Sequence, residues 1–192
     1  MTWKFYKKGY PTYDKTGWAK FKAKYDQTIE LCFEYYQNLL NEEFGGPKIT
    51  SQGFFMLSPY MNLYGYPEEL DYTDIVTLPD NYIRVDAFCR ELTETFKLPE
   101  EFKVQPSDKL IYLSMGSIGS SNVQLIRKIT ATLAKTPYKY IVSKGQHHEQ
   151  IELPANMWGR AYLPQTKILP LVDMVITHGG NNTVTETFYF GK

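Results

Sequence analysis

The residues best suited to chemistry stand near the end of the chain, in residues 177–183 (THGGNNT). An apolar, β-branched run at Met174–Thr177 leads into them and is typical of a buried parallel strand. Residues 184–190 indicate the first turns of a helix. Adjacent glycines let a backbone approach a ligand closely, and a helix N-terminus offers free N–H groups and partial positive charge. This strand–loop–helix order predicts a site for a phosphate or diphosphate.

Individual side chains in and after this loop suit such a ligand. Asn182 or Thr183 is a candidate N-cap whose side chain could instead bond a phosphate oxygen. His178, at the carboxyl end of the strand, can add a donor. Glu186 lies one turn beyond Asn182 on a similar face of the helix. A carboxylate at that place suits the paired hydroxyls of a ribose.

Two other motifs are weaker. Residues 116–119 (GSIG) follow a strand and precede a helix, but lack the G-x-G-x-x-G spacing and the P-loop lysine, so a plain turn and a phosphate contact both stay open. His147 and His148 are followed by Glu149. Adjacent side chains diverge, and zinc sites need convergent ligands, so these residues predict a solvated loop and no metal site.

The elements that must position these residues alternate between strand and helix. Strands are expected at 110–114, 138–143, 158–163 and 174–177, and helices at 122–134 and 165–172, with Asn122 or Ser121 as a cap and a flexible turn at 115–121. Such alternation predicts an α/β fold with a parallel, Rossmann-like sheet and right-handed crossovers. Ligands of these sheets sit beyond the carboxyl ends of the strands.

The first half of the chain has a different pattern. Residues 17–43 carry apolar side chains at helical spacing, and Gly45 with Gly46 ends the helix. That aromatic stripe could line a small-molecule pocket, although a core role is favoured. A short strand is expected at 61–64, a helix at 86–96 capped by Asp86, and a polar linker after it. The composition shift predicts two domains, 1–105 and 106–192.

Composition narrows the function classes. Lys+Arg and Asp+Glu are balanced at 21 each in 192 residues, which argues against nucleic-acid binding. Cys32 and Cys89 stand in apolar contexts and are expected to be buried free thiols rather than a disulfide. The sequence has no apolar run of membrane-spanning length, and residues 1–8 do not resemble a signal peptide. We therefore expect a cytoplasmic chain without a membrane segment.

The region from Tyr162 to Glu186 resembles the donor-binding signature of the UDP-dependent glycosyltransferases, which have the GT-B fold. The match runs through Tyr162-Leu163-Pro164-Gln165, the spacer at 168–173, the loop at 177–183 and Glu186. The resemblance implies transfer of a hexosyl group from a UDP-sugar to a small, lipophilic, hydroxylated acceptor. It implies no cofactor besides the UDP-sugar as co-substrate.

The resemblance also implies a set of donor-binding residues. That set is Gly116, Ser117, Tyr162, Gln165, His178, Gly180, Asn182, Thr183 and Glu186. Tyr162 stands where the family usually stacks a Trp on the uracil. Gln165 is expected at the base and ribose, and Glu186 at the ribose.

The rest of the set is expected at the phosphates. His178, Asn182 and Thr183 fall at the diphosphate, and Gly116 and Ser117 lie near the diphosphate or the acceptor cleft. No catalytic residue is expected in this chain, since the family's general-base His lies in an earlier segment and its acidic–Gln pair lies after residue 192. We expect a piece truncated at both ends, the end of an acceptor domain plus half of a donor domain, without activity. The alternative is a non-catalytic nucleotide-binding module.

Overall fold

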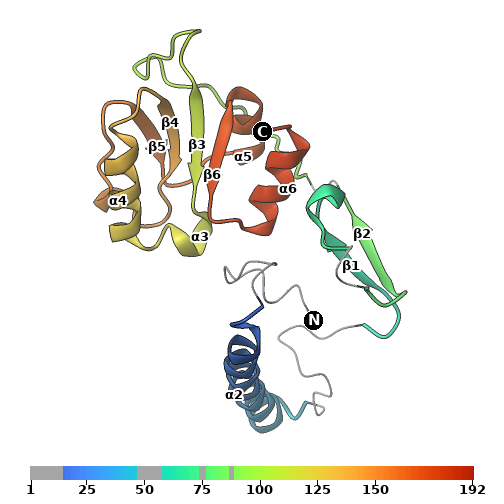
Figure 1. Cartoon of the computed structure of the whole chain (residues 1–192). Coiled ribbons are helices and arrows are strands. Elements are labelled where there is room, and N and C mark those ends of the chain that lie inside the picture. The colour runs from blue at the N-terminus through green and yellow to red at the C-terminus, as the bar shows by residue number, and fades with distance from the viewer. Residues whose placement is uncertain (1–14, 47–57, 74–76, 87–88) are drawn as a thin grey trace. The chain divides into compact units, whose positions relative to one another are not determined.

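The computed structural model describes residues 15–46, 58–73, 77–86 and 89–192 (Figure 1). The loop expected at the start of the chain lies outside these ranges. Packing divides the chain into two compact units, one of residues 1–64 with 71–83 and one of residues 65–70 with 84–192. The functional boundary near residue 105 stays a prediction.

The first unit contains the expected long helix, α2 (Trp18–Phe44). Gly45 ends it in the left-handed region at φ 58°, where glycine carries no Cβ penalty, and its N–H bonds the Leu40 carbonyl. The core role favoured for the aromatic stripe is wrong, since no residue of α2 is buried. Cys32, on this helix, and Cys89 are free thiols as expected, but both are half-buried rather than buried.

A two-stranded sheet pairs β1 (Asn62–Gly65) with β2 (Tyr82–Val85), and η1 (Glu68–Leu70) follows β1. The strand expected at 61–64 is confirmed with a shift of one residue. Ser58 organises its entry, because the Ser58 carbonyl accepts hydrogen bonds from the Asn62 and Asn81 amides at 2.9 and 3.1 Å. These local bonds fix the chain where few side chains are buried.

The helix expected at 86–96 is wrong. Residues 89–98 have no regular secondary structure, and Asp86 pairs with Arg84 at 3.4 Å instead of capping a helix. Phe96 and Leu98, two residues apart, pack against the core of the second unit. Tertiary packing thus decides the conformation of this segment, overriding a weak helical periodicity.

The second unit is built on the predicted parallel sheet, whose strand order is β5-β4-β3-β6. Its strands are β3 (Leu110–Ser114), β4 (Lys139–Ser143), β5 (Met157–Arg160) and β6 (Met174–Thr177). In the register of the sheet, Ser114 aligns with Ser143 on one side and Thr177 on the other. The carboxyl ends of these three strands therefore lie at the same edge of the sheet, as the predicted α/β fold requires.

Alternation along the strands fills two apolar clusters, one on each face of the sheet. Leu110 and Tyr112 join one cluster with Ile168 and Leu169, whereas Ile111 and Leu113 join the other. Every residue of β3 is buried. The central strand is thus held on both faces, which makes its carboxyl end a rigid platform.

Helices follow the strands at that platform. They are α3 (Gly116–Gly119), α4 (Val123–Leu133), η2 (His148–Gln150), α5 (Gln165–Ile168), η3 (Leu169–Leu171) and α6 (Asn181–Tyr189). The Asn122 side chain caps α4 by accepting from the Leu125 N–H at 3.0 Å, as predicted. The turn expected after β3 contains α3 instead. Figure 1 shows α3 and the start of α6 at one edge of the sheet.

Candidate donor-binding site

A cavity of about 520 Å³ opens at this edge of the sheet. Its wall includes all the predicted donor residues except Glu186: Gly116, Ser117, Tyr162, Gln165, His178, Gly180, Asn182 and Thr183. These residues come from the loops and the first turns of the helices that follow β3, β5 and β6. The prediction that these loops share one edge is confirmed.

The His178 ring joins the loop after β6 to the loop after β3. A Cβ added to Gly116, which has φ 66°, would lie 2.5 Å from the His178 Cε1, and one added to Gly180 would also lie 2.5 Å from it. Both distances are far below van der Waals contact. An alanine at Gly116 or Gly180 would therefore force the His178 imidazole to move, so the two glycines make room for the ring in this arrangement, a role separate from approach to a phosphate.

The N-terminus of α6 presents its N–H groups without a side-chain cap. Gly180 is the N-cap residue, in an extended conformation with no side-chain hydrogen bond, so the expectation of a cap at Asn182 or Thr183 is wrong. Gly179 takes φ 79°, which turns the chain from β6 into the helix. Asn181 bonds the Gly65 carbonyl at 3.0 Å, while Asn182 lines the cavity. Unused N–H groups at a helix start suit an anion.

Glu186 lies beneath the cavity wall rather than on it. Its side chain is 1% exposed, and its carboxylate accepts from Arg90 Nε at 2.7 Å and Arg90 Nη2 at 3.3 Å. Gln165 Nε2 donates to the same carboxylate at 2.6 Å, and the Thr183 hydroxyl donates to Gln165 Oε1 at 3.3 Å. This buried network sets the orientation of Gln165 and Thr183 at the wall.

Sequence reasoning missed Arg90, which lines the cavity. It stands 96 residues before Glu186, in a segment expected to be a helix. The hydrogen bond with Glu186 raises the pKa of the Arg90 guanidinium above its ordinary value, so the side chain is cationic. The sequence placed Glu186 toward a ribose and gave no sign that its carboxylate is buried, so it gave no reason to look for a cationic partner.

One buried phenol in the wall of the cavity is polar and uncharged. Tyr112 is 1% exposed, and burial raises the pKa of its phenol against the opposing effect of hydrogen bonds with Ser114 and Ser143. The phenol therefore stays neutral at physiological pH and adds no negative charge. At the rim, Tyr162 is 75% exposed and available for stacking.

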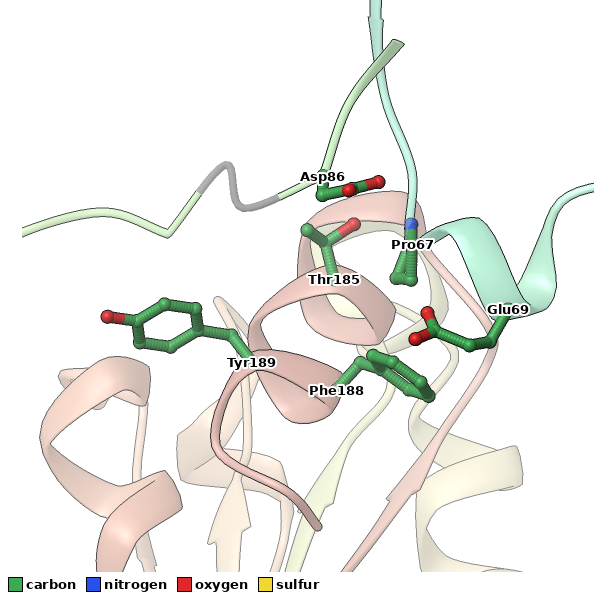
Figure 2. A pocket seen from close by; sticks show the side chains of 6 residues that line it. All are labelled: Pro67, Glu69, Asp86, Thr185, Phe188 and Tyr189. Carbon is green, nitrogen blue, oxygen red and sulfur yellow. The ribbon is translucent and has the colours of Figure 1, made fainter.

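A second, smaller pocket of about 190 Å³ lies beside α6 (Figure 2). Figure 2 shows Thr185 and Phe188 projecting from α6 near Pro67, Glu69 and Asp86. None of the predicted donor residues lines it. Two carboxylates in its wall make it unsuited to an anion, in contrast to the larger cavity.

The described ranges hold neither a cluster of metal ligands nor a membrane-spanning helix. No three His, Cys, Asp or Glu side chains gather there as ligands of a metal ion would. Within the same ranges, no helix combines the length and apolarity needed to cross a membrane.

Comparisons with known proteins agree with the resemblance read from the sequence. No family model matches the chain. The chain is 31% identical over 87 residues to the UDP-glucosyltransferase YojK of Bacillus subtilis (strain 168), a match that covers 44% of this chain and 22% of that protein. It is 22% identical over 141 residues to a sterol 3-beta-glucosyltransferase of Candida albicans (strain SC5314 / ATCC MYA-2876), covering 65% and 9% respectively. The matches thus span a small part of each relative's length.

A solved structure extends the similarity to nearly the whole chain. The glycosyltransferase of kitacinnamycin superposes with a TM-score of 0.62 at 18% sequence identity. The match covers 92% of this chain and 47% of that chain, so the similarity is one of fold. The shared fold is that of a glycosyltransferase of the GT-B type, and the sequence relatives are named as glucosyltransferases.

Proposed function

We propose that the cavity at the carboxyl edge of the sheet binds a UDP-sugar, and that the chain is the donor-binding part of a UDP-dependent glycosyltransferase. The observation that carries this proposal is the convergence of the predicted donor residues on one cavity. Its volume of about 520 Å³ falls in the range of small-molecule sites, roughly 300–1,000 Å³. The names of the sequence relatives support the same substrate class.

The chemistry of the wall suits a nucleoside diphosphate. Among the residues that the structure describes, no Asp or Glu lines the cavity, whereas Arg90 and the residues at the N-terminus of α6 do. Anions are stabilised by both kinds of group, through the helix dipole and charge-assisted hydrogen bonds. Asn182 and His178 add side-chain donors beside the helix start. The Thr183 hydroxyl donates to Gln165, so its contact with a phosphate requires that hydroxyl to turn toward the ligand. We assign the diphosphate to this part of the wall.

The nucleoside is assigned to the other side of the cavity. Tyr162 would stack on the uracil, and the Gln165 amide, held by Glu186, would bond the base or ribose. The assignment of Glu186 to the ribose stays a prediction. A direct contact requires its buried carboxylate, which already bonds Arg90 and Gln165, to open toward the ligand.

For the acceptor we propose a small, lipophilic, hydroxylated molecule, with support from the relative named as a sterol glucosyltransferase. Sugar transfer needs a base for the acceptor hydroxyl and support for the leaving diphosphate. The cavity offers support for the leaving diphosphate. His178 is a poor choice as the base for the acceptor hydroxyl because it lies at the proposed diphosphate site. We therefore propose that the 192-residue chain alone is inactive and needs no cofactor besides the UDP-sugar. A catalytically idle nucleotide module is not favoured, because the relatives are named as transferases.

Calorimetric titration tests the proposal. UDP and UDP-glucose should bind the chain saturably at one site, and Asn182→Ala should weaken both by about tenfold, the effect of losing a hydrogen bond to a charged group. Gln124→Ala, on the exposed face of α4, is the control and should leave both affinities unchanged. Saturable binding that Asn182→Ala does not weaken, or no binding by the folded chain, would contradict the assignment.

A further inference from the structure

One ion pair joins the irregular segment 89–98 to α6 and has its two halves in different environments. The Arg90 side chain is 57% exposed and lines the cavity, whereas the Glu186 side chain is 1% exposed and does not. The pair is therefore a dipole with its positive end toward the cavity. A ligand meets Arg90 before it can meet Glu186.

The anchoring of Arg90 is geometrically specific. Nε and Nη2 approach different carboxylate oxygens of Glu186, at 2.7 and 3.3 Å, which is the fork arrangement that fixes the plane of a guanidinium. Gln165 holds the carboxylate from a second direction at 2.6 Å. Two hydrogen bonds thus orient the Arg90 guanidinium, although its segment has no regular secondary structure.

Two of the five guanidinium N–H donors are used in this anchor. The remaining ones have no further hydrogen-bond partner among the described residues. Arg90 is also the one residue in the described wall of the cavity that carries a permanent charge. A diphosphate brings at least two negative charges, and one helix start supplies only about half a unit of compensating charge.

We propose that Arg90 is a donor-binding residue whose free N–H groups contact the diphosphate of the nucleotide, and that Glu186 acts as its positioning residue. This inference rests on the proposed function and adds to it a contact outside the region that resembles the family signature. Donor binding then couples the segment at 89–98 to the loop at 177–183. The buried carboxylate sets the geometry of the cation and is not itself required to reach the ligand.

The test compares a charged with an uncharged ligand. UDP and uridine are titrated into the wild-type chain, Arg90→Ala and Arg90→Lys. Arg90→Ala should weaken UDP by about tenfold or more and uridine by less than about threefold, because only UDP carries the phosphates. Arg90→Lys should fall between, since it keeps the charge but loses the fork.

The matched control is Arg127→Ala. Arg127 also makes two hydrogen bonds within this unit, both to the Gln150 carbonyl, and it does not line the cavity. Its loss should leave UDP binding unchanged. Thermal unfolding of each variant identifies any that does not fold, and if Arg90→Ala fails, Arg90→Lys gives the decisive comparison.

The outcomes separate this inference from the proposed function. Selective weakening of UDP supports the contact. Equal weakening of UDP and uridine means that Arg90 only supports the fold, and unchanged UDP affinity means that it makes no contact. Either result overturns this inference and leaves the donor site in place, whereas a folded wild-type chain that does not bind UDP overturns both.

Discussion

The helix α2 and the strand β3 carry equally clear apolar patterns but differ completely in burial. No residue of α2 is buried, and Leu31 and Tyr35 are 62% and 65% exposed. Every residue of β3 is buried between two apolar clusters. An apolar period is thus enough to specify an element, whereas stability depends on the surfaces that cover it. If this comparison is right, the cost of a substitution follows burial rather than element type.

The largest expected effect is a loss of stability in the sheet, and its absence would contradict the comparison most directly. Ile141 on β4 is fully buried, so Ile141→Ala should lower the free energy of unfolding by about 2–5 kcal/mol. Leu31→Ala on α2 should change it by less than about 0.5 kcal/mol, because the side chain is already exposed. Urea unfolding followed by circular dichroism measures both. Similar losses for the two variants would show that α2 is buried as deeply as the sheet.

The second prediction extends the comparison of buried and exposed side chains to a buried polar group. Glu186→Ala should cost about 1–3 kcal/mol, because the Gln165 amide, 8% exposed, loses its acceptor. The exposed Arg90 can be solvated, which keeps the cost below that of breaking a fully buried pair. Urea unfolding with Glu149→Ala, an exposed carboxylate, as control gives the value. A cost no larger than the control's would mean that the network does not hold the site.

The third prediction compares two glycines with similar backbone angles. Gly116 and Gly179 have φ of 66° and 79°, so alanine should cost about 1–2 kcal/mol at each from left-handed strain. Of these two glycines, a Cβ would meet the His178 ring at Gly116 and open space at Gly179, so Gly116→Ala should be the more costly. Thermal unfolding of both variants, alone and combined with His178→Ala, measures the difference. His178→Ala should remove the extra cost at Gly116; if it does not, the ring does not pack there.

The smallest expected effect lies at the exposed start of β6. Hydrogen bonds from Lys109 Nζ at 2.7 Å and the Leu110 N–H at 2.9 Å lower the pKa of the Asp173 carboxyl. The resulting stability is present above the unfolded pKa of about 3.9 and is lost as pH falls through the lower folded pKa. The melting temperature of Asp173→Asn should therefore lie slightly below wild type at pH 7 and approach it in acid. A gap that widens in acid would contradict the assignment.

The comparison also explains what could be predicted from the sequence. The bounds of β3 and β6 were both confirmed. β3 is buried on both faces and reads as a continuous apolar run, whereas β6 is only partly buried and is marked by its β-branched residues. The shared edge of the loops followed from parallel strand order alone. The helix predicted at 86–96 was wrong, although the apolar spacing there fits a weak helix. The conformation is set instead by contacts of Phe96 and Leu98 with a core that is distant in sequence. Arg90 and the His178 packing depend on such distant contacts, which local patterns do not encode.

The central claim is that the edge of the sheet near Gly116 and residues 178–183 holds the diphosphate of a uridine nucleotide. Amide chemical shifts of the ¹⁵N-labelled chain, followed by NMR during titration with UDP, test it residue by residue. The account predicts saturable shifts at Gly116, Ser117 and residues 178–183, with no change along the exposed face of α4. Shifts confined to the small pocket beside α6, or none in a folded sample, would contradict it.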